Sequence, residues 1–192
     1  MVLVALAAAM LPRAQAQPGR AWAQALVDQV RSSAYPEISG SEISVRSLNS
    51  ASDYFQARFE WRRFFTGRRM RYVILFNPRL LSLNAPEPGA QAIVAHELAH
   101  IARYRSGNRL RLLGLARLLA AGPRARFERG ADREAIRRGF GPGLKEYRLW
   151  LYKNVPPTAI PGKLRDYLSP DEIEAILLLG LNPPGGGRGP VE

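Results

Sequence analysis

The chain has 192 residues, 46% of them hydrophobic, which is enough for one domain with a packed core and too little for two. It contains no cysteine, which excludes disulfide bonds and thiolate metal sites, so any metal must be bound by histidine and carboxylate groups. The net charge of +12 can indicate nucleic acid, an anionic membrane or acidic partners, but the arginines that carry it are spread along the chain, and a solvated basic surface explains them more simply.

Residues 1–16 begin with ten apolar positions and end in the triplet Ala14-Gln15-Ala16. This pattern is typical of the hydrophobic part of a secretory signal peptide with a cleavage site before Gln17. The apolar run is far shorter than the roughly 20 residues of a membrane-spanning helix. We therefore expect a signal peptide and a periplasmic or secreted protein. The alternative is an N-terminal helix of a cytoplasmic protein.

Hydrophobic periodicity predicts a helix followed by a strand in the next part of the chain. Trp22, Leu26 and Val30 recur at helical spacing within residues 21–31, as the apolar face of a packed helix does. Alternating apolar positions then indicate a short strand at residues 43–48.

Two further strands are predicted before the next helix. Residues 54–65 alternate between apolar and charged side chains, which indicates a half-buried strand. Residues 71–77 read RYVILFN, a continuous run typical of a more buried strand. With a turn at residues 66–69, the two strands should form an antiparallel hairpin that packs under the following helix.

A predicted helix at residues 90–104 carries the most informative motif. It contains His96-Glu97-Leu98-Ala99-His100, which is an HExxH pattern, and these are the only two histidines in the chain. Histidines four residues apart project from one helix face and can bind one zinc ion, while Glu97 can act as general base on a zinc-bound water. The alternative is an ordinary amphipathic helix that happens to carry two histidines.

The rest of the chain is predicted to be mainly helical. Leucines at residues 110–119 indicate a packed or membrane-surface helix, ended by a break at Gly122-Pro123. Further helices are predicted at residues 127–138, closed by Gly139, and at residues 144–152.

A proline-rich connection and a last helix complete the predicted domain. We expect residues 155–162 to form the connection and residues 170–179 the helix, which opens with a capping box between Ser169 and Glu172. The tail, residues 181–192, has too few apolar groups to order itself and is expected to be disordered. The zinc-binding domain would therefore span residues 17–180.

A catalytic zinc site needs a third protein ligand, which here must be an aspartate or a glutamate. The acids that follow the motif are Glu128, Asp132, Glu134 and Glu146. Glu128 and Asp132 share one face of a predicted helix, so Glu128 can reach the metal while Asp132 accepts a hydrogen bond from one zinc histidine. The alternative is that both acids pair with Arg124, Arg129 or Arg133 on a solvated helix.

The HELAH motif, a preceding strand that ends in Asn-Pro and a later E-x-x-A-D segment resemble the gluzincin metallopeptidases. Within these, residues 73–140 look most like the HtpX, BepA and CAAX prenyl endopeptidase group. The resemblance implies a zincin-like α+β domain in which a small antiparallel or mixed sheet packs on an active-site helix pair, with further helices at the C-terminus. It also implies that His96, His100 and Glu128 bind zinc, that Glu97 activates water and that Asp132 supports the site.

Two features depart from that group. The gap between His100 and Glu128 is shorter, so any inserted lid or membrane hairpin is reduced. No downstream histidine is present to stabilise an oxyanion, which leaves Tyr147, Tyr152, Arg133 and Arg137 as candidates, with no basis for a choice among them. Proteases of the SprT type and the metzincins use a third histidine, which this chain lacks.

The sequence therefore predicts a zinc-dependent endopeptidase that acts on protein or peptide substrates. The closest enzyme alternative is a cytoplasmic regulatory protease of the ImmA type, which also uses a later glutamate. A protein that keeps zinc only for structure is a second alternative. A basic nucleic-acid-binding protein is a third, but no recognition module or zinc-finger spacing supports it, so we expect no specific nucleic-acid partner.

Overall fold

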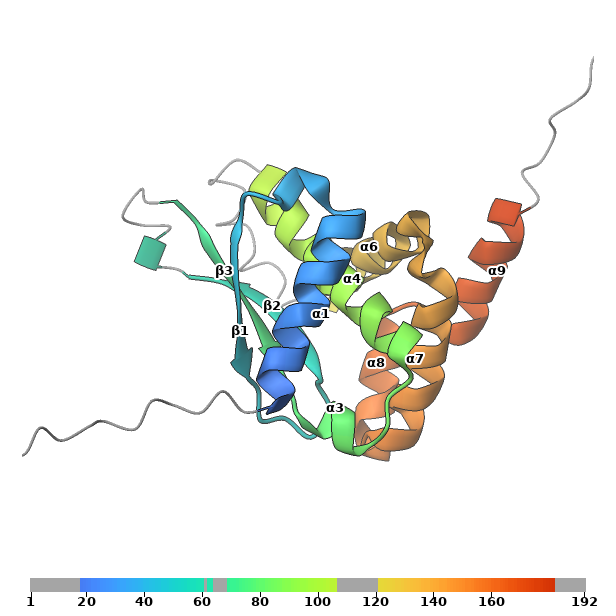
Figure 1. Ribbon diagram of the computed structural model, residues 1–192. Helices are drawn as coiled ribbons and strands as arrows, with labels where there is room; N and C mark the ends of the chain where they lie inside the picture. The colour runs from blue at the N-terminus through green and yellow to red at the C-terminus, as the bar shows by residue number, and fades with distance from the viewer. Residues whose placement is uncertain (1–17, 61, 64–68, 107–120, 182–192) are drawn as a thin grey trace, which may run out of the picture.

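The computed structural model describes residues 18–60, 62–63, 69–106 and 121–181 (Figure 1). The predicted signal peptide at residues 1–16 and the predicted helix at residues 110–119 lie outside the described residues. So does the predicted tail, except for Leu181. The described chain forms one α+β domain, as predicted, in which helices pack against a small sheet.

The sheet has three strands in the order β1-β3-β2. β1 (Glu42–Ser47) pairs parallel with β3 (Arg71–Phe76), and β2 (Phe55–Phe59) pairs antiparallel with β3. The predicted hairpin is therefore confirmed. The prediction that its first strand reaches residue 65 was wrong, because Glu60 makes the last strand bond, to Arg71, and the chain then turns.

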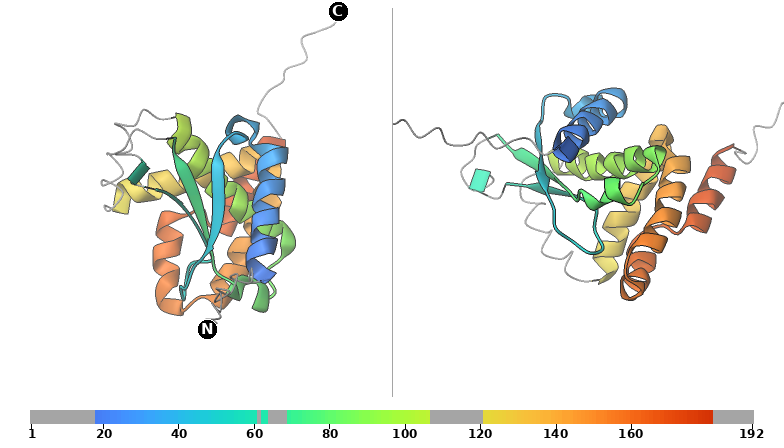
Figure 2. Two further views of the ribbon diagram at one scale, coloured as in Figure 1. Left: turned by 60° about the vertical axis from the view of Figure 1, so that its left-hand side comes forward. Right: turned by 60° about the horizontal axis from the view of Figure 1, so that its bottom comes forward.

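Helices cover one face of the sheet, as the two views in Figure 2 show. The helix α1 (Pro18–Ala34) packs against β1 and against α4 (Glu87–Ser106), and α4 also packs against β2. Between α1 and β1 lies the short 3-10 helix η1 (Pro36–Ile38). The strand residues that face these helices are buried: Ile43, Val45, Phe55, Phe59, Tyr72, Ile74 and Phe76.

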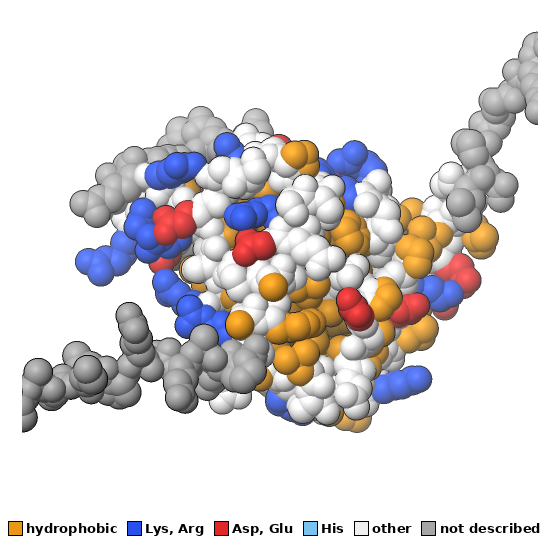
Figure 3. All heavy atoms as spheres, viewed as in Figure 1, with side chains coloured by type: hydrophobic (Ala, Val, Ile, Leu, Met, Phe, Trp, Pro, Cys, Tyr) orange, Lys and Arg blue, Asp and Glu red, His pale blue; other side chains and the backbone are white. Residues whose placement is uncertain are grey.

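The other face of the sheet carries charged side chains joined across the strands. Glu60 pairs with Arg46 at 2.9 Å and with Arg63 at 3.4 Å, and Glu42 pairs with Arg71. Figure 3 shows Lys and Arg side chains gathered on this side of the molecule. Exposed pairs of this kind contribute little to stability, so we regard this face as a solvated basic surface.

The helix α4 is the centre of the domain and carries the HExxH motif. A short helix, α3 (Arg79–Ser82), precedes it, and α4 begins directly after Pro86, three residues earlier than predicted. Its residues from Gly89 to Ile101 are buried, except Gln91, because it packs against the sheet, α1 and two later helices. None of the described helices is long and apolar enough to cross a membrane.

Two longer helices follow the undescribed residues 107–120. The first, α6 (Ala121–Ala135), packs against α4 and begins six residues before the predicted start. Gly122-Pro123 therefore lies in the first turn of α6, where the missing N–H of proline would have no helical partner. A π-helical turn, η3 (Ile136–Phe140), in which Gly139 has a φ of 92°, leads into α7 (Gly141–Asn154).

The end of the described chain contains two shorter helices. The predicted connection at residues 155–162 was wrong in part, because it holds a 3-10 turn, η4 (Pro157–Ala159), and the start of α8 (Ile160–Asp166). The last helix, α9 (Pro170–Leu181), is confirmed and continues through Gly180. A small second hydrophobic core joins α9 to α4 and α7. Its buried residues are Ala92, Leu144, Leu168 and Ile173.

Candidate metal centre

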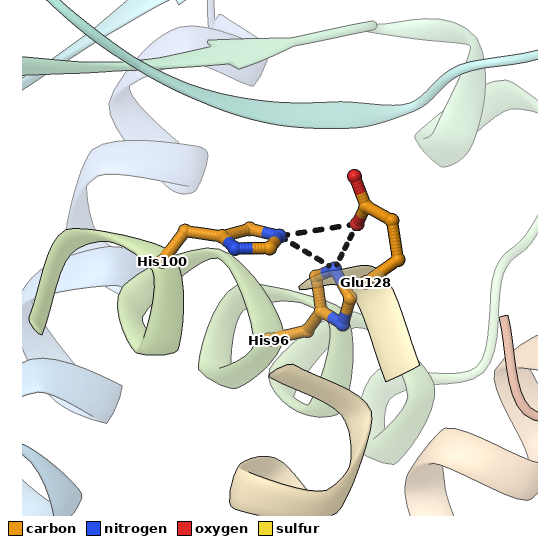
Figure 4. A group of neighbouring side chains, drawn as sticks. All are labelled: His96, His100 and Glu128. Carbon is orange, nitrogen blue, oxygen red and sulfur yellow. Dashed lines mark hydrogen bonds and ion pairs between the residues drawn. The ribbon is translucent and has the colours of Figure 1, made fainter. Parts of the chain in front are cut away.

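Three side chains from α4 and α6 converge on one point (Figure 4). The Nε2 atoms of His96 and His100 lie 3.1 Å apart. The Oε2 atom of Glu128 lies 3.2 Å from the first and 3.1 Å from the second. Ligands bound at about 2.0–2.2 Å in a tetrahedral zinc site are separated by roughly 3.3–3.6 Å, so these three atoms fit one metal ion after shifts of a few tenths of an ångström.

Asp132 fixes the ring of His96. Its Oδ1 atom lies 2.8 Å from the Nδ1 of His96, and its Oδ2 accepts a hydrogen bond from the backbone N–H of Leu168 at 2.8 Å. Burial raises the pKa of Asp132, but the charges of Arg148 and His96 lower it more, so the carboxylate is ionised. Nδ1 of His96 therefore donates to Asp132, which leaves Nε2 as the ring atom that faces the other two ligand atoms.

His100 is held by stacking. Its ring lies parallel to that of Phe127, with an interplanar angle of 11° and centroids 4.5 Å apart. The Nδ1 atom of His100 is buried and has no hydrogen-bond partner among the described residues. Phe127 directly precedes Glu128 on α6, so one short segment both orients the second histidine and supplies the third ligand.

The charges of the site favour a cation. Three carboxylates, those of Glu97, Glu128 and Asp132, meet there, whereas among the described arginines and lysines only Arg148 pairs with any of them. With neutral histidines and ionised carboxylates, a divalent metal would balance the excess negative charge. The donor set, two imidazoles and one carboxylate, is one that first-row divalent metals accept, and the described residues thus fit a metal ion.

The pKa values of the ligands are shifted by the same excess of negative charge. Burial lowers the pKa of His96, but the carboxylates of Asp132 and Glu128 raise it more, to about 10. Burial raises the pKa of Glu128, but hydrogen bonds with His100 and His96 lower it far below its usual range. The site holds a proton tightly, and a metal ion would compete with that proton for the same atoms.

Glu97 lies between the ligand atoms and the edge of the sheet. Its side chain is buried, and its Oε2 accepts a hydrogen bond from the backbone N–H of Ala57 in β2 at 2.5 Å. Burial raises the pKa of the Glu97 carboxyl, and the charges of the two histidines offset this only in part. A carboxyl group with a raised pKa, next to a metal site, is suited to take up and release a proton.

A cleft of about 190 Å³ opens over these groups. Glu97, His100 and Glu128 form part of its wall, and the strand β2 and two tyrosines, Tyr104 and Tyr167, form much of the rest. A smaller pocket continues inward behind Glu97, between Tyr147, Lys163 and Tyr167.

The four residues predicted as candidates to stabilise an oxyanion are not brought together. Arg133 and Arg137 are exposed and line neither pocket, and Arg137 pairs with Glu134. Tyr152 also lines neither pocket. Tyr147 is buried and lines only the inner pocket. The two arginines project to solvent from α6 and η3 and lie away from the cleft.

The alternative in which Glu128 and Asp132 pair with nearby arginines of their own helix is not observed. Arg124 pairs with Asp166 at 3.2 Å, and Arg129 pairs with Glu172. Glu128 lies against the histidines instead.

Three further residues contribute to the site without having been predicted from the sequence: Ala57, Arg148 and Tyr167. A signal for Arg148 was present, because Leu144, Tyr147, Arg148 and Leu151 have the i, i+3, i+4, i+7 spacing of a buried helix face. An arginine on such a face needs an acidic partner. The local sequence gives no comparable signal for Ala57 or Tyr167.

Comparisons of the chain with models of protein families, with curated proteins and with solved structures found no match. The function must therefore be argued from the geometry and chemistry of this site alone.

Proposed function

We propose that the protein is a zinc-dependent endopeptidase with its active site at the α4–α6 metal centre. The observation that carries the proposal is the position of Glu97. Its carboxyl group lies in the same buried site as the converging atoms of His96, His100 and Glu128, and it borders the same cleft. A site that served only to bind metal for structure would have no need of this fourth, non-ligating carboxyl group in the cleft.

Zinc bound by His96, His100 and Glu128 would polarise the scissile carbonyl group and lower the pKa of a water molecule. Glu97 takes a proton from the attacking water as the new carbon–oxygen bond forms. It then transfers that proton to the peptide nitrogen as the carbon–nitrogen bond breaks. The products are a carboxylic acid and an amine, which account for all atoms of the peptide and the water.

The strand β2 supports a peptide as the substrate. It is an edge strand. The residues that flank it, Tyr54 and Glu60, make backbone hydrogen bonds with the strand β3 and the residue after it. The intervening odd-numbered residues therefore direct their backbone groups toward the free edge, where the N–H of Ala57 contacts Glu97. An extended peptide that pairs with this edge would pass directly over the cleft.

The proposal is tested by zinc content and proteolysis of casein, with Glu97→Gln compared with Glu87→Gln. Glu87 is an exposed glutamate on the same helix. We expect stoichiometric zinc in all three proteins and a loss of about 10²–10⁴-fold in activity in Glu97→Gln alone. Full activity in Glu97→Gln would mean that a contaminant cleaves the casein, and would favour the non-catalytic zinc protein. Iron in place of zinc would overturn the assignment of the metal.

Export to the periplasm or outside the cell remains a prediction from residues 1–16. The cytoplasmic regulatory protease is the competing proposal. Cell fractionation with an antibody against the protein, and N-terminal sequencing of the mature form, separate the two. A mature chain that begins at Gln17 would support export.

A further inference from the structure

Tyr167 lines both the main cleft and the pocket behind Glu97, as do Asp53, Phe55 and Glu97, and of the tyrosines that line either space it is the one that lines both. It lies between α8 and α9, in a segment that packs against α6. Its ring centroid is 5.8 Å from that of His96. Its phenol is therefore close both to a metal ligand and to the proposed general base.

The backbone beside Tyr167 is fixed by buried bonds. The next residue, Leu168, donates its N–H to Asp132 at 2.8 Å, and the carbonyl oxygen of Tyr167 accepts a bond from Arg129 at 3.0 Å. Asp132 is the same carboxylate that orients His96. The metal ligand and Tyr167 thus have a common anchor, and their separation is set by one buried group.

The ring of Tyr167 is fixed as well. The guanidinium carbon of Arg148 lies 4.5 Å from the ring centroid, and the ammonium nitrogen of Lys163 lies 5.4 Å from it. These two cation–π contacts restrain the ring between the two side chains.

Among the described residues, the hydroxyl group of Tyr167 makes no hydrogen bond. The side chain is half-buried and lines the cleft. A fixed donor beside a metal centre, without a protein partner, is arranged to bond a group that enters with the substrate.

Tyr104 is the other tyrosine of the cleft, on the side of His100. It packs among aromatic rings, edge-on to Phe59 and parallel to Phe127. No cation lies over its ring among the described residues, and it does not border the pocket behind Glu97. The surroundings of Tyr167 therefore favour it as the donor.

We propose that Tyr167 donates a hydrogen bond to the carbonyl oxygen of the scissile peptide as negative charge develops there. The phenol keeps its proton throughout. The one proton that must move in the reaction passes from the water to the peptide nitrogen through Glu97. This inference rests on the proposed peptidase function and assigns the oxyanion donor that the sequence left open.

The test is Tyr167→Phe, with Tyr152→Phe as the matched control. Tyr152 also has a hydroxyl group with no partner among the described residues, but it lies outside both pockets. We expect Tyr167→Phe to keep its zinc content, thermal unfolding midpoint and KM, and to lose about 100-fold in kcat. Tyr152→Phe should match the wild type in all four measurements.

Binding of a peptide phosphonamidate gives a second readout that does not depend on turnover. Such a tetrahedral analogue should bind Tyr167→Phe about 100-fold more weakly than the wild type, whereas a substrate analogue that resists cleavage should bind both alike. A kcat for Tyr167→Phe within about two-fold of the wild type, or a larger loss in Tyr104→Phe, would overturn the role of Tyr167 while the peptidase function stands. A zinc-loaded wild type without peptidase activity would overturn both.

Discussion

Asp132 and Arg148 form an ion pair at 2.8 Å, with exposed side-chain fractions of 0% and 2%. Asp132 is held by this pair in the ionised form that accepts the Nδ1–H of His96. Replacement of Arg148 by methionine should leave the buried Asp132 carboxylate without its arginine partner and lower the free energy of unfolding by about 3–5 kcal/mol. Urea unfolding of the metal-free protein would measure the loss.

The double variant Asp132→Asn/Arg148→Met is the control for this prediction. Because it removes both charges, its loss of stability should be smaller than the sum of the two single losses. Asp132→Asn alone should also weaken zinc binding by about 10–100-fold, since His96 loses the acceptor that orients it. Additive losses in the cycle would show that the two residues act independently.

A metal ion bound by Glu128 and the two histidines should stabilise the folded protein. Removal of zinc by a chelator should lower the thermal unfolding midpoint of the wild type, since a ligand that binds only the folded state stabilises it by about 2.7 kcal/mol at a concentration 100 times its Kd. Glu128→Gln should show a much smaller shift, because the third ligand is gone, whereas the exposed Glu146→Gln should behave as the wild type does. Equal shifts in all three proteins would contradict the assignment of Glu128.

The features that were predicted from the sequence are those that helix geometry fixes locally. The spacing of His96 and His100 places both on one helix face, and that of Glu128 and Asp132 does the same on α6. The capping box is confirmed in detail. The N–H of Ser169 bonds the Glu172 carboxylate at 2.9 Å, and the N–H of Glu172 bonds the Ser169 hydroxyl at 3.2 Å.

The features that were missed depend on packing between distant elements. Arg148 reaches Asp132 only because α7 packs against α4 and α6, and Tyr167 reaches the cleft only because Leu168 bonds Asp132. The parallel pairing of β1 with β3 likewise depends on non-local contacts. The predicted connection at residues 155–162 overlaps the start of α8 because Pro161 and Gly162 favour a loop by sequence, whereas the first turn of a helix tolerates the proline.

Lys163 and Asp53 form a pH-dependent contact, at 2.6 Å, beside the cleft. Burial raises the pKa of Asp53, but Lys163 and the hydroxyl groups of Ser50 and Ser52 lower it more, to below its usual 3.8. The ionised carboxylate therefore stabilises the fold above about pH 4, and this stability is lost as the pH falls through the lower, folded-state pKa.

Lys163→Met should accordingly destabilise the protein at pH 7 and have a smaller effect near pH 3. The effect at pH 7 should be no more than about 1 kcal/mol, because the Asp53 side chain is 46% exposed and the pair is screened by solvent. Urea unfolding at the two pH values measures it. Lys145→Met, which removes a surface lysine paired with Glu174, controls for the loss of a positive charge. A loss from Lys163→Met that grows toward pH 3 would contradict the prediction.

Gly143 sets the distance between α4 and α7, and hence the position of Arg148. A Cβ atom at this position would overlap the carbonyl group of Pro88 in the first turn of α4, and backbone cannot move aside as a flexible side chain can. Gly143→Ala should therefore lower the free energy of unfolding by about 1–3 kcal/mol and weaken zinc binding, because α7 must shift away from α4. Gly162→Ala is the matched control, since a Cβ there meets open space within α8, and alanine should be neutral or stabilise by up to about 1 kcal/mol. Equilibrium unfolding and a competitive zinc titration of both variants would decide the point, and wild-type stability in Gly143→Ala would show that the two helices have room to separate.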